Sequence, residues 1–287
     1  MNDLAIKALS GAYALHQIIL IRAFIGISLA LALMWISKPG FRQILTQRPG
    51  AHLIRVSIVM VSNITYFVGL SLMPLADAVR AEAMKAYLLN QFEFLGLPAP
   101  MRRAAVKGIG KVQWQSTDDL LAAAELLWQR PEREYRYTAV DLLRQHSAQL
   151  SVNDLPALQA LLLRDAWWET VDGLSAVIAE VMRAAVLQKP NAAVTMEIWL
   201  KHPSFWVRRS AMLHQLGWRL DTDTTRLFGF AQQLAVEKEF FIRKAIGWAL
   251  RDYARWNPQA VTEFLVQHRA QLSGLTVREA AKHLTLP

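Results

Sequence analysis

The 287-residue sequence contains no cysteine, and this absence excludes several kinds of chemistry at once. A disulfide framework, a thiolate zinc site, a cysteine nucleophile and a cysteine-ligated iron–sulfur cluster all require Cys side chains. The sequence also lacks an HExxH motif, a GxSxG motif and a P-loop, and its seven histidines show no metal-ligand spacing. We therefore expect a protein that works without a metal ion and without a cofactor.

Acidic residues are scarce at the start of the chain. Residues 1–80 hold only Asp3 and Asp77 against seven basic residues, a net charge of +5. Arg22 is the only charged residue between 16 and 37, and residues 56–76 carry no charge. Uncharged runs of this length can cross a bilayer as helices, so the sequence predicts two membrane spans at these positions and membrane association through residues 16–76.

The alternative for this segment is a buried helical hairpin of a soluble core. Such a hairpin needs a polar face at helical spacing, and residues 23–36 offer only Ser28. The stretches "ALHQIILIRAFIGISLALALMW" and "SNITYFVGLSLMPLADAV" resemble helices of EamA-type drug/metabolite transporters. The resemblance implies a truncated transporter fragment over about residues 2–79, because such transporters need further helices to form a transport path.

The composition changes near residue 80, which divides the sequence into a predicted membrane segment, 1–79, and a second domain, 80–287. The second part carries 25 basic and 21 acidic residues and nine of the ten tryptophans. Its apolar residues recur at three- and four-residue spacing, which predicts an all-α fold. Ser116 is expected to cap a helix, and Pro131, Pro203 and Pro258 are expected in first helical turns.

Aromatic pairs recur along the second part of the chain and indicate structural repeats. They stand at 167–168, 205–206 and 240–241, with Tyr135 two periods before Phe205. This spacing is typical of stacked helix pairs, so we expect an α-solenoid of HEAT-like helical repeats. Basic residues on the helices that line its concave surface, one from each repeat, would favour a polyanion, although charge alone favours an ordinary solvated face. These residues are Arg208, Arg209, Arg243, Lys244 and Arg251.

Several motifs then resemble, in the same order, the HEAT-like DNA alkylation repair glycosylases of the AlkD type. The resemblance covers about residues 84–283 and implies excision of positively charged N3- and N7-alkylated purines, such as 3-methyladenine and 7-methylguanine, from duplex DNA. Matching motifs place the family's catalytic residues at Trp168, Asp172 and Trp248, and its DNA-binding residues at Arg209 and Tyr87. The motifs are "MKAYLLNQFEFLGLPAPMRR", "PEREYRYTAVDLL", "WWETVD", "FWVRRSAMLHQL" and "EKEFFIRKAIGWALRDYARWNP".

The chemistry of these residues can also be argued directly. Trp168 and Asp172 are four residues apart and share one face of a helix, so a ring and a carboxylate can approach one sugar together. An alkylated purine is already cationic and leaves without protonation, while the remaining oxocarbenium-like sugar is stabilised by a carboxylate. Tryptophan rings suit a cationic lesion, and Arg209 suits a phosphate. Alternatively, Asp172 could simply pair with Arg209, and the tryptophans could be packing residues.

The two predicted segments conflict in location. Basic residues between the predicted spans put that loop in the cytoplasm, which would send the repair domain away from the chromosome. The possible explanations are a natural fusion, a gene-model artefact, or a hairpin that does not insert, and we prefer an artefact or recent fusion. We expect a monomer acting on cytoplasmic DNA, or an inner-membrane location if residues 16–76 insert. The alternative functions are a non-catalytic DNA-binding module and a transporter fragment.

Overall fold

A computed structural model of the protein describes residues 75–107 and 114–285. Every regular element in these two ranges is a helix, which confirms the predicted all-α class. The predicted membrane spans lie outside the described residues, apart from the last two residues of the second span. Among the described helices, none combines the length and the apolar character that crossing a membrane requires.

The chain divides into two compact units, Met1–Ala105 and Val106–Pro287. The described helices of the first unit are α4 (Leu75–Tyr87) and α5 (Ala99–Ala105). Lys85 in the last turn of α4 forms an ion pair with Glu93 at 2.7 Å, which ties the loop after α4 to the helix. Tyr87 ends α4 with 72% of its surface exposed.

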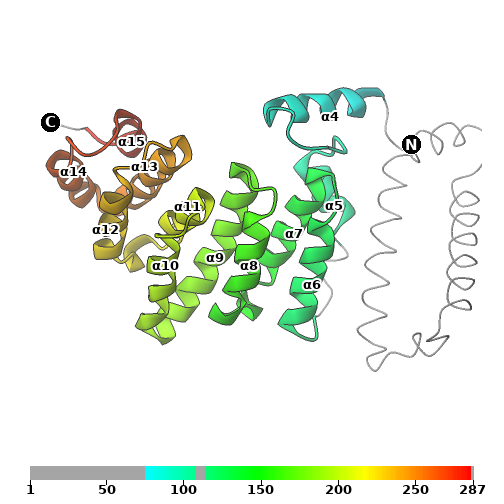
Figure 1. The fold of residues 1–287 in the computed structure, drawn as a ribbon, viewed down its shortest axis with the longest axis horizontal. Coiled ribbons are helices and arrows are strands. Elements are labelled where there is room, and N and C mark those ends of the chain that lie inside the picture. Colours follow the sequence, from blue (N-terminus) through cyan, green and yellow to red (C-terminus); the bar gives the residue numbers. More distant parts are fainter. Residues whose placement is uncertain (1–74, 108–113, 286–287) are drawn as a thin grey trace, which may run out of the picture. The chain divides into compact units, whose positions relative to one another are not determined.

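The second unit is a series of helix pairs that follow one another in chain order (Figure 1). In each pair a first helix is followed by a second helix, and consecutive second helices pack on each other. This arrangement confirms the predicted solenoid of helical repeats. The pairs are α6 (Thr117–Trp128) with α7 (Arg133–Gln145), α8 (Leu155–Leu163) with α9 (Trp168–Gln188), α10 (Val194–Trp199) with α11 (Phe205–Leu213), α12 (Thr224–Leu234) with α13 (Phe240–Ala254), and α14 (Pro258–Gln267) with α15 (Gly274–Ala280).

Apolar side chains from both helices of each pair fill the interior of the second unit. Leu120, Leu143 and Leu174 are fully buried, and each such side chain contributes about 1.5–3 kcal/mol relative to exposure. Several tryptophans belong to this core. The Trp128 indole donates to the Arg164 carbonyl at 3.3 Å, and the Trp218 indole donates to the Ala179 carbonyl at 3.2 Å. Both rings are buried packing residues of the core.

The helix ends agree with most of the predicted start signals. The Ser116 side chain caps α6 by accepting from the backbone N–H of Asp119 at 3.2 Å. Pro258 is the first residue of α14, where the missing N–H costs nothing. The prediction was wrong for Pro131 and Pro203, which precede the N-cap residues of α7 and α11.

Two glycines allow second helices to approach closely. A Cβ atom at Gly173 of α9 would lie 2.8 Å from Cγ1 of Val140 on α7. A Cβ atom at Gly247 of α13 would lie 2.5 Å from Cβ of Glu279 and 2.9 Å from the Thr276 carbonyl oxygen, both on α15. These glycines are adjacent in sequence to Asp172 and Trp248, so α9 contacts α7 closely beside Asp172 and α13 contacts α15 closely beside Trp248.

Candidate nucleic-acid site

The helix starts give the second unit a common register. Counting from the first residue of each second helix, the fifth position is occupied in turn by a phenol, a carboxylate and three cations. Equivalent positions of stacked repeats lie on the same side of a solenoid. The row consists of Tyr137, Asp172, Arg209, Lys244 and Arg278.

Asp172 and Arg209 form the centre of this row. The Arg209 guanidinium donates from Nε to Oδ1 at 2.7 Å and from Nη2 to Oδ2 at 2.9 Å. Its Nη1 atom also donates to the carbonyl of Phe241 on α13. The side chains are only 5% and 16% exposed, so the pair lies largely out of water. One guanidinium thus connects three consecutive second helices.

Burial and pairing act in opposite directions on this carboxyl group. Burial raises the pKa of Asp172, because an anion loses its hydration, and Arg209 opposes the rise by hydrogen bonding and by its charge. Burial is the larger effect, so the pKa lies above its usual value. The ionised state of Asp172 consequently depends on Arg209.

Aromatic rings cover one side of the pair. Trp206 and Phe241 are the second residues of α11 and α13, and their ring centroids are 4.9 Å apart. Trp167, immediately before α9, contacts both rings, with centroid distances of 5.9 and 5.4 Å. The guanidinium carbon of Arg209 lies 6.0 Å from the Phe241 ring centroid. Trp167, Trp206 and Phe241 therefore pack on one another beside Arg209.

The two predicted catalytic tryptophans lie on the same packed helices. Trp168 is the first residue of α9, one turn before Asp172, and is half-buried. Trp248 is half-buried on α13, which packs against α11, the helix of Arg209. The structure thus brings Asp172 and Arg209 into contact and puts both tryptophans on helices that contact α11.

The other predicted DNA-binding residues are engaged in contacts within the protein. Arg208 donates to both carboxylate oxygens of Glu237 at 2.6 and 2.8 Å. Arg243 donates to the Glu237 carbonyl at 3.0 Å. Lys244 and Arg251 share Glu279, at 2.8 and 3.0 Å. Tyr87 belongs to the first compact unit. A DNA-binding role for these five residues remains a prediction.

Sequence reasoning missed two features of this region. Arg278 of α15 is exposed at the fifth position, and the helix register would have pointed to it. Arg133 begins α7 and is fully buried, which its sequence context does not reveal. Within the described ranges no cluster of three or more His, Asp or Glu side chains is arranged to hold a metal ion.

Most of the chain is similar to known proteins. A family model described as "DNA alkylation repair enzyme" matches residues 69–284. The match starts before the predicted domain boundary at residue 80 and overlaps the second predicted span. Nothing in the comparisons supports the transporter resemblance of residues 2–79, and the predicted fusion is likewise unsupported. The chain matches none of the curated proteins.

Solved structures add similarity in both sequence and fold. A predicted DNA alkylation repair enzyme from Enterococcus faecalis is 33% identical, with a TM-score of 0.65, over 72% of this chain and 95% of that one. AlkD2 from Streptococcus mutans is 18% identical, with a TM-score of 0.52, over 71% and 98% of the two chains. The protein smu.31 from Streptococcus mutans UA159 is 18% identical, with a TM-score of 0.51, over 73% and 99%. The last two share the fold.

Proposed function

The chain belongs to the family of DNA alkylation repair enzymes, and from this premise we propose that it is a DNA glycosylase. Its substrates would be positively charged N3- and N7-alkylated purines in duplex DNA, with 3-methyladenine and 7-methylguanine as representatives. Such an activity starts base excision repair and belongs where the chromosome is, in the cytoplasm. The observation that supports it best is the buried Asp172 carboxylate, held by Arg209 one helical turn from Trp168.

The proposed reaction is hydrolysis of the bond between the sugar C1′ and the purine nitrogen. The electron pair of that bond leaves with the cationic base, which becomes neutral, and a positive charge develops on the sugar. The Asp172 carboxylate would stabilise that charge and orient a water molecule. Oxygen of the water bonds to C1′, and its proton passes to the carboxylate or to solvent. No external oxidant or acid is required.

Arg209 has two roles in this proposal. Its charge keeps Asp172 ionised in a setting that would otherwise favour the neutral acid. Three of its five N–H groups are used by Asp172 and the Phe241 carbonyl. The phosphate contact that the sequence predicts would have to use the remaining N–H groups of a side chain that is only 5% exposed. Trp168 and Trp248 would offer ring faces to the sugar and to the cationic lesion.

A second candidate is a non-catalytic module that binds DNA structure. The observation that favours it is the pairing of both Asp172 oxygens with one guanidinium, since a fully paired carboxylate also suits a purely structural ion pair. In that case the second unit would bind duplex DNA without breaking the glycosidic bond.

Base release separates the two candidates. The full chain is incubated with methylated duplex DNA, and free 3-methyladenine and 7-methylguanine are measured for wild type and Asp172→Asn. We expect release by the wild type and a loss of about a hundredfold or more in the variant. Asp221→Asn is the control, because Asp221 pairs with Arg183 at an exposed site. Duplex binding without release would favour the binding module.

A further inference from the structure

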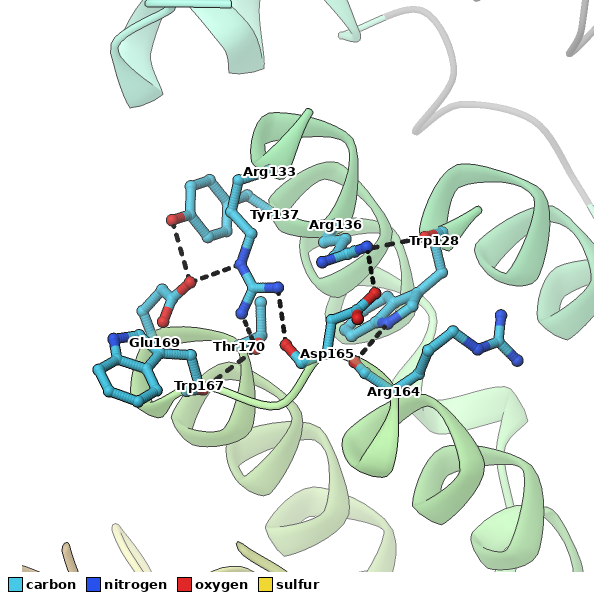
Figure 2. Close-up of polar contacts among 9 residues, drawn as sticks. All are labelled: Trp128, Arg133, Arg136, Tyr137, Arg164, Asp165, Trp167, Glu169 and Thr170. Carbon is cyan, nitrogen blue, oxygen red and sulfur yellow. Dashed lines mark hydrogen bonds and ion pairs between the residues drawn. The ribbon is translucent and has the colours of Figure 1, made fainter. Parts of the chain in front are cut away.

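A second buried arginine holds the chain segment that leads into Trp168 and Asp172. Arg133, the first residue of α7, has no exposed surface. Its Nε atom donates to Glu169 Oε1 at 2.6 Å, its Nη1 to the Asp165 carbonyl at 2.9 Å, and its Nη2 to Thr170 Oγ1 at 2.8 Å. Figure 2 shows this guanidinium between the side chain of Glu169 and the chain at Asp165.

The acceptors of Arg133 lie around the start of α9. Glu169 and Thr170 are the second and third residues of α9 and directly follow Trp168, while Asp165 lies three residues before it. Thr170 in turn donates to the carbonyl of Trp167 at 3.1 Å. A rigid fork that bonds three points of one short segment restricts both the position and the direction of the helix that follows.

The segment also contains a strained residue. Asp165 has a backbone φ of +47°, in the left-handed region that few residues other than glycine adopt. Its carboxylate accepts from Arg136 at 2.7 Å, while its carbonyl accepts from Arg133. A strained conformation of this kind persists where the surroundings determine it, and such residues cluster at functional sites.

Glu169 depends heavily on this network. Its Oε1 atom accepts from Arg133 and from the Tyr137 hydroxyl, the latter at 3.3 Å. Its Oε2 atom is buried and has no hydrogen-bond partner among the described residues. The hydrogen bonds to this largely buried carboxylate are therefore made through one oxygen. A change at Arg133 or Tyr137 would alter the position of Glu169 and with it the start of α9.

We infer that Arg133 and Glu169 are positioning residues that set the orientation of Trp168 and Asp172. The inference rests on the proposed function for its catalytic consequence. A related arrangement occurs two repeats later, where Arg209 binds Asp172 and the Phe241 carbonyl. In both cases the arginine donates from Nη1 to a carbonyl 32 residues further along. Each guanidinium thus connects its own helix with the start of the second helix of the next repeat.

Two substitutions test the network with little change in side-chain volume. Glu169→Gln removes the charge, and Arg133→Lys removes the fork. Glu237→Gln is the matched control, because Glu237 pairs with Arg208 between later repeats and the Arg133 acceptors do not include it. We expect the first two variants to release base between about tenfold and about a hundredfold more slowly under single-turnover conditions. Duplex affinity stays within a factor of about two, since phosphate contacts dominate it, and the control keeps the wild-type rate.

A fluorine NMR measurement tests the positioning role without any activity. The chain is labelled with 5-fluorotryptophan, and the Trp168 and Trp248 resonances are assigned from Trp168→Phe and Trp248→Phe. We expect the Trp168 resonance to shift in both network variants and to stay in place in Glu237→Gln, while the Trp248 resonance stays in place throughout.

An unmoved Trp168 resonance in Glu169→Gln and Arg133→Lys overturns the inference, whether or not the protein releases base. If the Trp168 resonance moves in both variants but the wild-type protein releases no base, the positioning role is supported and the glycosylase proposal is rejected. If Arg133→Lys does not fold, Glu169→Gln alone decides the question, because a neutral amide retains the shape of the carboxylate.

Discussion

Arg209 binds both carboxylate oxygens of Asp172, which lies 37 residues earlier in the chain and one repeat away. The Arg209 side chain is 5% exposed and that of Asp172 is 16% exposed. The geometry is fixed before any DNA arrives, which lowers the cost of organising the site during a reaction.

Replacing Arg209 by Gln should move the acid limb of the pH–rate profile. Burial raises the pKa of Asp172 and Arg209 opposes that rise, so removing Arg209 raises the pKa further. Because the ionised form is the active one, base release falls as the pH drops through this pKa. The limb should therefore lie at higher pH in the variant. Rates from pH 4 to pH 9 are compared with those of Arg208→Gln, because Arg208 is adjacent in sequence to Arg209 but binds Glu237 and not Asp172. An acid limb at the same pH in both would contradict the proposed coupling.

Replacing Gly247 by Ala should destabilise the protein and displace α15. The added methyl would lie 2.5 Å from Cβ of Glu279, so the two helices must separate, at a cost of about 1–3 kcal/mol. Gly229 in the middle of α12 is the matched control, because nothing lies within 4 Å of a Cβ added there. Gly229→Ala should stabilise by about 0.5–1 kcal/mol. Denaturant unfolding measures both changes, and equal effects would refute the close approach.

His214 should make the protein sensitive to acid. Its ring is buried, and burial lowers its pKa to about 4. As the pH falls below about 6.5, His214 takes up a proton in the unfolded chain but not in the folded one. The free energy of unfolding is therefore unaffected by His214 above about pH 6.5 and decreases toward pH 4, by up to about 3 kcal/mol. His214→Gln should flatten this dependence. His283→Gln, at an exposed position, should leave it unchanged when unfolding is followed from pH 8 to pH 4.

Arg278 should contact a DNA phosphate. It occupies the fifth position of α15, in the row that contains Asp172 and Arg209, and it is exposed. Losing one phosphate contact reduces the slope of log K against log salt concentration by about 0.9. Arg278→Gln is compared with Arg269→Gln, which removes an exposed charge just after the first helix of the same pair. Equal slopes for wild type and Arg278→Gln would remove Arg278 from the interface.

The repeat architecture could be predicted from sequence because its signals are local. The aromatic pairs mark the starts of α9, α11 and α13, and the start of α6 was recognisable from Ser116. Tyr135 was the weaker marker, since it is the third residue of α7 and not the first. The spacing of Trp168 and Asp172 likewise put both on one helical face, as the structure has them.

The remaining features depend on contacts between repeats. Arg208 and Arg209 are adjacent in the sequence, yet their carboxylate partners lie in different repeats. No local pattern distinguishes such arginines from solvated ones, and the same is true of the buried Arg133. Before residue 80, the apolar runs alone could not distinguish a membrane span from a buried helix. The family match begins inside the second predicted span. A run of apolar residues does not by itself reveal what covers it.

The Arg209 guanidinium also has a mechanical consequence for the second unit. It binds α9 on one side and the start of α13 on the other, while its own backbone belongs to α11. A change in the angles between these three helices would therefore strain the hydrogen bonds of this guanidinium. The alignment of the Asp172 carboxylate is thereby linked to the curvature of the second unit.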